Sequence, residues 1–220
     1  MEYIALDFET ANHQSGGACA IGMVRFDMDG NPLDSFYSLL CPRVAYFDPW
    51  MSQIHKLKSE DCLAAPSFPE LWGSIRDFIH GNLVCAHNAA FDMRVLARTL
   101  EVYGLFSDPI TYVCTCNLAR RLWRGLSSYS LSSLVSYLEL QDLRHHHALD
   151  DALMCGKLLH RECGGHLSDV RELRRFLVSK GYLPKQLAVG QVSENPEFSS
   201  PKRPQECYPE PEQQVPEDLA

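Results

Sequence analysis

Three short acidic clusters constrain the fold of this 220-residue chain more than any other feature. The clusters are Asp7-Phe8-Glu9-Thr10, Asn88-Ala89-Ala90-Phe91-Asp92 and His146-His147-Ala148-Leu149-Asp150-Asp151. Each lies in or beside an apolar run, where an unpaired charge is costly. A fold that brings several carboxylates together needs a positive partner, and Mg²⁺ or Mn²⁺ fit this need because they prefer oxygen ligands.

The first cluster follows the apolar residues 3–6, which predict a buried strand. Side chains alternate along a strand, so Asp7 and Glu9 are expected to point to the same face. Two neighbouring carboxylates repel each other unless a cation lies between them. The pair therefore predicts one half of a metal site.

The other two clusters are predicted at helix starts. Asn88 is predicted to cap a helix that carries Asp92 in its first turns and ends before Gly104. The third cluster is predicted to open another helix, with Asp151 near its N-terminus and His146 in the preceding loop. Taken singly, each cluster has an ordinary explanation as a strand end, a helix cap or a surface loop. Their joint occurrence predicts a single site.

The set Asp7-x-Glu9, Asn88-x-x-Phe91-Asp92 and His146-x-x-x-x-Asp151 resembles the three motifs of the DEDDh 3′→5′ exonucleases. That family includes the proofreading epsilon subunit of bacterial replicative polymerase, ribonuclease T and oligoribonuclease. The resemblance covers residues 1–163, and residues 18–22 and 130–134 support it. It implies an α/β, ribonuclease H-like fold, with a mixed central sheet flanked by helices. A predicted hairpin turn at residues 29–32 and helical spacing from Leu131 agree with this fold.

The resemblance also implies the chemistry. One metal ion would be held by Asp7, Glu9 and Asp151, and a second by Asp7 with help from Asp92. The expected cofactor is therefore two Mg²⁺ or Mn²⁺ ions, which stabilise the attacking and leaving oxygens of a phosphoryl displacement. His146 would be the general base, because imidazole titrates near neutral pH. The expected products are nucleoside 5′-monophosphates from 3′ ends of single-stranded nucleic acid, with DNA favoured over RNA, although the motifs do not separate the two.

The register of the histidine has two solutions. The family spacing of five residues pairs His146 with Asp151, or His145 with Asp150. Ala152 matches the Asp-Ala pair that is usual in the family, so the first solution is preferred. His147 and Asp150 are then expected to be structural or to face solvent.

Substrate contacts are expected at two places. The resemblance implies that Phe8, Thr10, His55 and Asn88 lie near the terminal nucleotide, although Phe8 also fits a core position and His55 a helix cap. Arg120, Arg121, Trp123 and Arg124 combine guanidinium groups with an aromatic ring, which suits phosphate contact and base stacking. A solvated basic helix end explains the same residues equally well.

Charge and composition favour an intracellular enzyme. From Gln191 onward the chain holds seven acids and two bases, so this tail carries −5 of the net charge of −8. Four of the remaining acids are the proposed metal ligands. Nine scattered cysteines, mostly in apolar segments, indicate free thiols in a reduced cytoplasm. We expect no signal peptide, no transmembrane segment and no membrane partner.

The expected organisation is an exonuclease domain at 1–165, an accessory helical extension at 166–190 capped by Ser168, and a disordered acidic, Pro-rich tail at 191–220. Residues 186–189 weakly resemble peptides that bind sliding clamps, but they lack the terminal apolar pair, so chance explains them better. The expected partners are 3′ ends of single-stranded DNA or RNA and a DNA polymerase or another replication or repair factor. The alternative function is a non-catalytic nucleic-acid-binding accessory subunit, which the intact acidic quartet disfavours.

Overall fold

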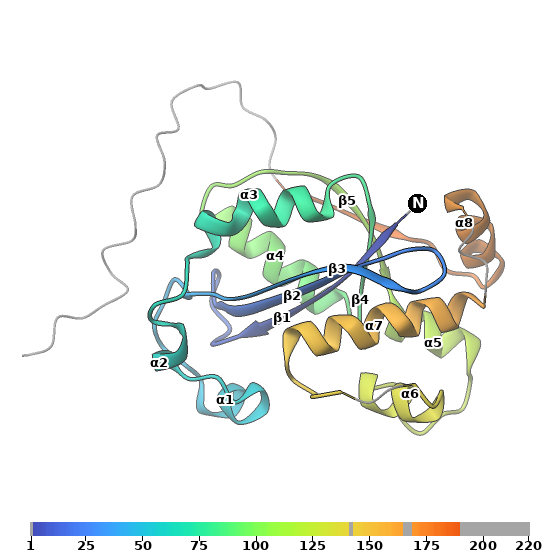
Figure 1. Cartoon of the computed structure of the whole chain (residues 1–220), viewed down its shortest axis with the longest axis horizontal. Coiled ribbons are helices and arrows are strands. Elements are labelled where there is room, and N and C mark those ends of the chain that lie inside the picture. Colours follow the sequence, from blue (N-terminus) through green and yellow to red (C-terminus); the bar gives the residue numbers. More distant parts are fainter. Residues whose placement is uncertain (1, 141–142, 165–168, 190–220) are drawn as a thin grey trace, which may run out of the picture.

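The computed structural model describes residues 2–140, 143–164 and 169–189, which form one six-stranded sheet with helices against both faces (Figure 1). The strands are β1 (Tyr3–Thr10), β2 (Ala18–Phe26), β3 (Pro32–Leu39), β4 (Leu83–Ala86), β5 (Ser107–Cys114) and β6 (Lys185–Val189). The helices are α1 (Pro49–His55), α2 (Ser59–Cys62), α3 (Phe68–Ile79), α4 (Ala90–Val102), α5 (Thr115–Leu122), α6 (Leu131–Tyr137), α7 (Ala148–Cys163) and α8 (Val170–Ser179). The sheet order is β3-β2-β1-β4-β5-β6. β1, β4 and β5 are parallel and the other pairings are antiparallel, so the predicted mixed sheet is confirmed.

The first three strands form in the way that the sequence predicts. The apolar start of β1 is buried, because the strand pairs with β2 on one side and with β4 on the other. The turn between β2 and β3 is closed by Asp27, whose carboxylate accepts the backbone N–H of Asn31 at 2.8 Å and its side-chain amide at 3.0 Å. Gly30 supplies the positive φ of 81° that this turn requires. The predicted hairpin is therefore confirmed.

Alternate side chains of β1 enter two different cores. Ile4, Leu6 and Phe8 pack with α3 and α4 on one face of the sheet. Tyr3 and Ala5 pack with α5, α7 and α8 on the other face. Because the alternation continues along the strand, the acids at positions 7 and 9 point to the face that α7 covers.

Two glycines allow α7 to approach the sheet closely. A Cβ atom at Gly22 would lie 2.2 Å from the carbonyl carbon of Ala148, the first residue of α7. A Cβ atom at Gly156 would lie 2.0 Å from the ring of Phe26, and the Tyr3 hydroxyl donates to the Gly156 carbonyl at 3.0 Å. Any larger residue at these positions would push the helix away from β1. This approach fixes the place of the helix start.

The C-terminal extension differs from the prediction. It contains α8, as expected, but residues 185–189 form strand β6, which pairs with β5, so they are part of the sheet and the purely helical interpretation is wrong. The N-cap of α8 is Asp169, whose carboxylate accepts the Glu172 N–H at 2.8 Å, and the predicted cap Ser168 lies outside the described residues. Tyr182 ties the extension to the sheet, because its hydroxyl accepts the Cys114 N–H at 2.6 Å. The tail predicted to be disordered lies outside the described residues.

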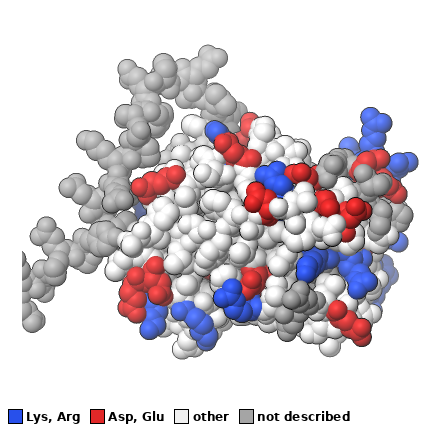
Figure 2. Space-filling view, viewed as in Figure 1, with Lys and Arg blue, Asp and Glu red and all other residues white. Residues whose placement is uncertain are grey.

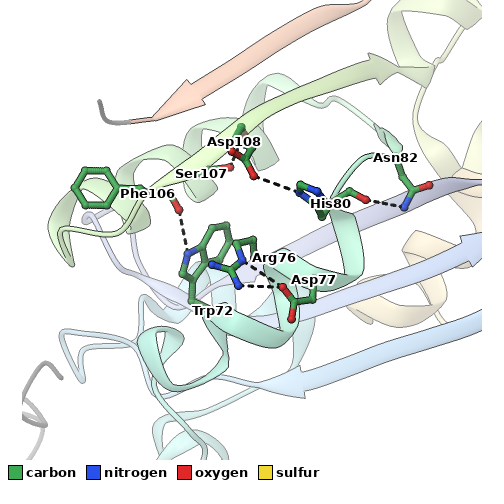
Figure 3. A network of polar contacts seen from close by, with 8 residues as sticks. All are labelled: Trp72, Arg76, Asp77, His80, Asn82, Phe106, Ser107 and Asp108. Atoms are coloured by element: carbon green, nitrogen blue, oxygen red, sulfur yellow. Dashed lines mark hydrogen bonds and ion pairs between the residues drawn. The ribbon is translucent and has the colours of Figure 1, made fainter. Parts of the chain in front are cut away.

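A polar network joins the end of α3 to the start of β5 (Figure 3). The indole N–H of Trp72 donates to the Phe106 carbonyl at 3.1 Å, and His80 Nδ1 lies 3.3 Å from Asp108 Oδ2. His80, Asn82 and Asp108 also line a cavity of about 770 Å³. This cavity lies at the edge of the sheet where β4 and β5 begin, opposite to the edge where β1 ends in Glu9 and Thr10. No helix of the described residues is long and apolar enough to cross a membrane.

Candidate functional site

Three of the predicted carboxylates converge where β1 ends and α7 begins. Asp7 and Glu9 lie on β1, and Asp151 lies in the first turn of α7. One oxygen atom of each lies within 4.8 Å of the others. The arrangement follows from the alternation of β1 and from the glycine contacts that hold the start of α7 against β2. The positive end of the α7 dipole also favours negative charge at Asp151.

Asp92 joins this group from the opposite side of the sheet. It lies in the first turn of α4 and is 1% exposed. Its Oδ1 accepts the backbone N–H of Phe8 at 3.1 Å, which anchors the carboxylate to the strand between the other two acids. Its Oδ2 is buried and has no hydrogen-bond partner among the described residues. A buried carboxylate oxygen without a partner is costly unless a cation contacts it.

Burial raises the pKa of all four carboxyl groups, and repulsion within the group adds to this for Asp7, Glu9 and Asp92. Burial raises the pKa of Asp7 well above its usual range, and repulsion from the other three groups raises it further. The same two causes, with burial the larger, raise the pKa of Glu9 to about 8. Burial raises the pKa of Asp92 to about 7, against the lowering effect of its backbone hydrogen bonds. Burial also raises the pKa of Asp151, and the N–H of His146 opposes this shift.

These residues fit a divalent metal ion. The donor set is composed only of carboxylate oxygens, which hard cations prefer. The orphaned Oδ2 of Asp92 is a donor that the protein leaves unused. A bound cation would also remove the repulsion that raises the pKa of Asp7 and Glu9. The structure thus brings Asp7, Glu9 and Asp151 together and holds Asp92 at the backbone of Phe8, and the role of the four as metal ligands stays a prediction.

The three histidines before α7 have different surroundings. His146 has a positive φ of 61°, and its backbone N–H donates to Asp151 Oδ2 at 2.9 Å, while its side chain is exposed. His145 Nδ1 lies 3.8 Å from Asp151 Oδ1. His147 stacks on Tyr37 with ring centroids 4.8 Å apart, and its Nδ1 lies 3.5 Å from Asp150 Oδ2. His147 and Asp150 thus have the structural surroundings expected for them, whereas His145 and His146 both lie beside Asp151.

Several predicted substrate contacts are placed differently. Phe8 is 2% exposed and packs in the core with α4, which is the alternative that the sequence left open, so its side chain offers little surface to a nucleotide. Thr10 is also buried, with its hydroxyl 3.7 Å from the Met51 sulfur. Both ring nitrogens of His55 are used: Nε2 lies 3.2 Å from the Thr10 carbonyl, and Nδ1 accepts the Leu57 N–H at 3.0 Å. His55 therefore joins α1 to the end of β1.

The sequence predicted that Asn88 caps α4, but it does not. It adopts a positive φ of 61°, and the N-cap residue is Ala89. Asparagine tolerates this left-handed conformation better than most residues, so it turns the chain from β4 into α4. Its carbonyl accepts the Phe91 N–H at 2.8 Å. The residue thus positions the helix start through its backbone.

The predicted basic cluster lies around the end of α5. Arg120 lies over the Tyr129 ring at 5.3 Å, and Arg121 donates from Nε to the Gly181 carbonyl at 3.1 Å. Trp123 packs edge-on to Tyr137 at 6.2 Å, so its ring is partly committed to the fold. Arg124 is exposed. These side chains lie around α5 and its neighbours, and the carboxylates are held by β1, α4 and α7.

Sequence reasoning missed other groups near the site. Trp50 in the first turn of α1 is 66% exposed, and α1 contacts the end of β1 through Met51 and His55. His87 holds the end of β4 to other elements, with Nδ1 2.9 Å from Thr115 Oγ1 and Nε2 2.9 Å from the Tyr129 carbonyl. The only signal for His87 was its place directly before Asn88. Trp50 follows a Pro at a helix start, which indicates a turn and gives no information about exposure.

Comparisons with known proteins agree with this geometry. The exonuclease family model, of ribonuclease T type, matches residues 4–159. DNA polymerase III PolC-type from Thermotoga petrophila is 33% identical over 163 residues, which are 72% of this chain but 12% of that protein. DNA polymerase III subunit epsilon from Treponema pallidum is 29% identical over 176 residues, covering 74% of this chain and 80% of that protein. The chain therefore spans about an eighth of the length of the PolC-type polymerases it matches.

Solved structures show the same architecture. Exonuclease X in complex with 5′ overhanging duplex DNA aligns with a TM-score of 0.63 and 27% identity, over 79% of this chain and 98% of that one. The nuclease domain of 3′hExo, a DEDDh family member bound to rAMP, aligns with a TM-score of 0.64 and 14% identity, over 74% and 92%. The second likeness shows the fold alone. The predicted resemblance is confirmed: the chain belongs to the exonuclease family of ribonuclease T type and has a ribonuclease H-like fold.

Proposed function

We propose that this protein is a metal-dependent 3′→5′ exonuclease that releases nucleoside 5′-monophosphates from single-stranded nucleic acid, with DNA favoured. The observation that carries the proposal is the convergence of Asp7, Glu9 and Asp151, with one oxygen of each within 4.8 Å of the others. Asp92 adds a buried carboxylate with an unused oxygen beside them. A fold does not keep four such acids together for stability alone, because their mutual repulsion opposes folding.

Each carboxylate has a defined task. Asp7, Glu9 and Asp151 would hold one Mg²⁺ or Mn²⁺ ion, and Asp7 and Asp92 would hold a second. Two such ions, when bound, neutralise charge on the phosphoryl group and lower the pKa of a bound water. The Phe8 N–H holds Asp92 in a fixed orientation at 3.1 Å, and the His146 N–H holds Asp151 at 2.9 Å. These backbone donors preorganise the acids, which avoids reorganisation during the reaction.

His146 is the proposed proton acceptor for the attacking water. Its backbone is tied to Asp151 while its side chain is exposed, so the imidazole can face a substrate at the cluster. Its charge also contributes to the lowered pKa of His55, behind the larger effect of burial, which supports a position near the end of β1. His145 is the competing candidate because its ring lies beside the same carboxylate.

The proposed substrate is the 3′ end of single-stranded DNA or RNA, and the proposed partner is a DNA polymerase or another replication or repair factor. The relatives named as DNA polymerase III subunits support the second point. Thr10 and His55 would shape the pocket through the backbone, because their side chains are buried and contact neighbouring elements. Asn88, which is exposed, would contact the substrate with its side chain. We place the enzyme in the cytoplasm on the strength of these replication relatives.

One assay tests this function. The full chain is incubated with 3′-labelled single-stranded DNA and RNA in parallel, with Mg²⁺, with Mn²⁺ or with excess EDTA. We expect labelled mononucleotides from the DNA in either metal and none in EDTA. Hydrolysis that persists in EDTA, or that proceeds from a blocked 3′ end, would contradict the mechanism.

A non-catalytic nucleic-acid-binding subunit is the alternative function. The complete quartet argues against it, since a binding protein has no need to keep Asp92 buried with an unused oxygen. Tight binding of single-stranded DNA without any release of mononucleotides, in either metal and across pH 6–9, would favour this alternative.

A further inference from the structure

Basic residues are concentrated in two segments far apart in the sequence. Residues 115–124 and 169–185 contain eight Lys and Arg but two Asp and Glu, whereas the rest of residues 1–190 contains ten bases and nineteen acids. The eight bases, here called the basic face, are Arg120, Arg121, Arg124, Arg171, Arg174, Arg175, Lys180 and Lys185, and all are exposed. A chain of net charge −8 thus gathers a local excess of six positive charges.

Contacts between α5 and the extension join the two segments into one surface. Arg121 donates to the Gly181 carbonyl at 3.1 Å, and its guanidinium lies 5.6 Å from the centroid of the Tyr182 ring. Leu122 and Phe176 pack against the same apolar cluster beneath. Figure 1 shows the end of α5 and α8 at the same end of the molecule, and Figure 2 shows Lys and Arg along that end.

Internal stability does not explain this surface. In the part of the chain that the structure describes, Arg124, Arg171 and Arg174 form no ion pair with a carboxylate. The two acids in the segments are Asp169, which caps α8, and the half-buried Glu172. Arg171 and Arg175 are spaced four residues apart on one helix, an arrangement that is destabilising for like charges, and the Asp169 carboxylate, on which both charges act, supplies one negative charge against the two. An anionic partner would relieve this repulsion.

The position of the surface fits an extended polyanion that starts at the carboxylates. β5 is parallel to β4 and β4 to β1, so α5 begins at the same edge of the sheet where the carboxylates lie. The eight residues of α5 then run away from that edge, and the helix is about 12 Å long at 1.5 Å per residue. The basic face therefore begins at the far end of α5 from the carboxylates, and it reaches further still at α8, because Arg174 lines the cavity at the opposite edge of the sheet.

We propose that the basic face binds the phosphate backbone of the nucleic-acid strand upstream of the 3′ end, beyond the nucleotides that lie at the carboxylates. The proposal rests on the proposed function only for the position of that 3′ end. α8 and β6 lie outside residues 4–159, the stretch that the exonuclease family model matches, so five of the eight bases of this surface belong to the extension of this chain. Backbone binding of this kind is independent of sequence and depends strongly on salt.

The first test measures binding without turnover. A fluorescein-labelled 20-nucleotide single-stranded DNA is titrated with the full chain in EDTA at several salt concentrations, and anisotropy gives Kd. For Arg171→Gln/Arg174→Gln we expect weaker binding and a slope of log Kd against log salt that is smaller by about 1.4, from about 0.7 per lost phosphate contact. The matched control is Arg94→Gln/Arg98→Gln, which removes two exposed charges from α4 on the other face of the sheet and should leave the slope unchanged.

The second test measures turnover as a function of substrate length in Mg²⁺. The Arg171→Gln/Arg174→Gln variant should have a raised KM for the 20-nucleotide strand and an unchanged kcat/KM for a dinucleotide, which is too short to reach the face. Arg171→Lys/Arg174→Lys keeps the charge and should restore the KM. If wild-type protein binds DNA as expected but hydrolyses nothing, the proposed function fails while the basic face stands.

Three outcomes would overturn the proposal. The first is an equal loss of binding in the α4 control, since the effect would then be one of net charge. The second is unaltered salt dependence in a folded Arg171→Gln/Arg174→Gln variant. The third is a change in melting temperature on charge removal that disappears when residues 191–220 are deleted, because the face would then hold the acidic tail of this chain.

Discussion

Gly22→Ala tests whether the position of α7 controls activity independently of the stability of the fold. Gly22 pairs with Asp7 across the β1–β2 ladder, and an added Cβ would lie 2.2 Å from the Ala148 carbonyl carbon. Ordinary contact begins near 3.4 Å, so the start of α7 must retreat by about 1 Å and take Asp151 with it. A misplacement of this size can lower the rate about 100-fold. Overpacking should also lower the free energy of unfolding by about 1–3 kcal/mol.

The assay compares kcat on single-stranded DNA in saturating Mg²⁺ with the thermal unfolding midpoint. The control is Gly73→Ala in α3, where an added Cβ meets no atom within 4 Å. That change should raise stability by about 0.5–1 kcal/mol and leave kcat unaltered. A Gly22→Ala variant that unfolds at a lower temperature but keeps wild-type kcat would refute the link between this contact and the site.

Four other predictions concern ionisable groups. His146→Ala should lower kcat, measured by single-turnover hydrolysis, by about 10²–10⁴-fold while Mg²⁺ binding persists. His147→Ala is the control and should keep most of the activity. An inactive His147→Ala variant beside an active His146→Ala variant would show that the wrong histidine was paired with Asp151. The half-saturating Mg²⁺ concentration should rise as pH falls from 8 to 6, because Glu9 (pKa about 8) and Asp92 (pKa about 7) must lose protons to bind a cation. The same raised pKa values predict that the metal-free protein unfolds at a lower temperature as pH rises through 7–8, because a carboxyl group with a raised folded-state pKa contributes stability only at lower pH. An unfolding temperature that does not change with pH, measured by calorimetry, would contradict this. Burial raises the pKa of Glu162 well above its usual range. Glu162→Gln should therefore raise the unfolding temperature at pH 8, by about 2–4 °C for each kcal/mol gained in the free energy of unfolding, and by less at pH 5. Equal effects at both pH values would show that the charge of Glu162 is not the cause.

The sequence predicted the acidic site because local rules place its members. Strand alternation puts Asp7 and Glu9 on one face, and the position of Asp151 in a first helical turn follows from the apolar spacing after it. Both inferences need only a few neighbouring residues. The structure adds how these elements meet, through the close approach of Gly22 to the start of α7.

Other features depend on partners distant in the sequence. Phe8 was expected near a nucleotide, but the face of β1 on which it lies is closed by α4, and local pattern does not reveal which face is covered. Residues 185–189 form a strand because they pair with β5, more than 70 residues earlier, and a run of only three apolar residues after Lys185 and Gln186 gives little strand signal. Asparagine is a common N-cap residue, so the sequence suggests a cap at Asn88, and only its positive φ in the structure identifies it as a turn residue.

The extension also contributes to the edge that carries the site. Tyr182 accepts the Cys114 N–H at 2.6 Å, and the next residue, Thr115, holds His87 through a contact of 2.9 Å. His87 is fixed at its other nitrogen by the Tyr129 carbonyl, and burial lowers its pKa to about 4, so it stays neutral and keeps both contacts at physiological pH. Since His87 directly precedes the turn into α4, this chain of contacts leads from the extension to the helix that holds the fourth carboxylate. The sheet therefore ties residues beyond 165 to the edge that carries the carboxylates, and removing them should disturb α4 as well as β5.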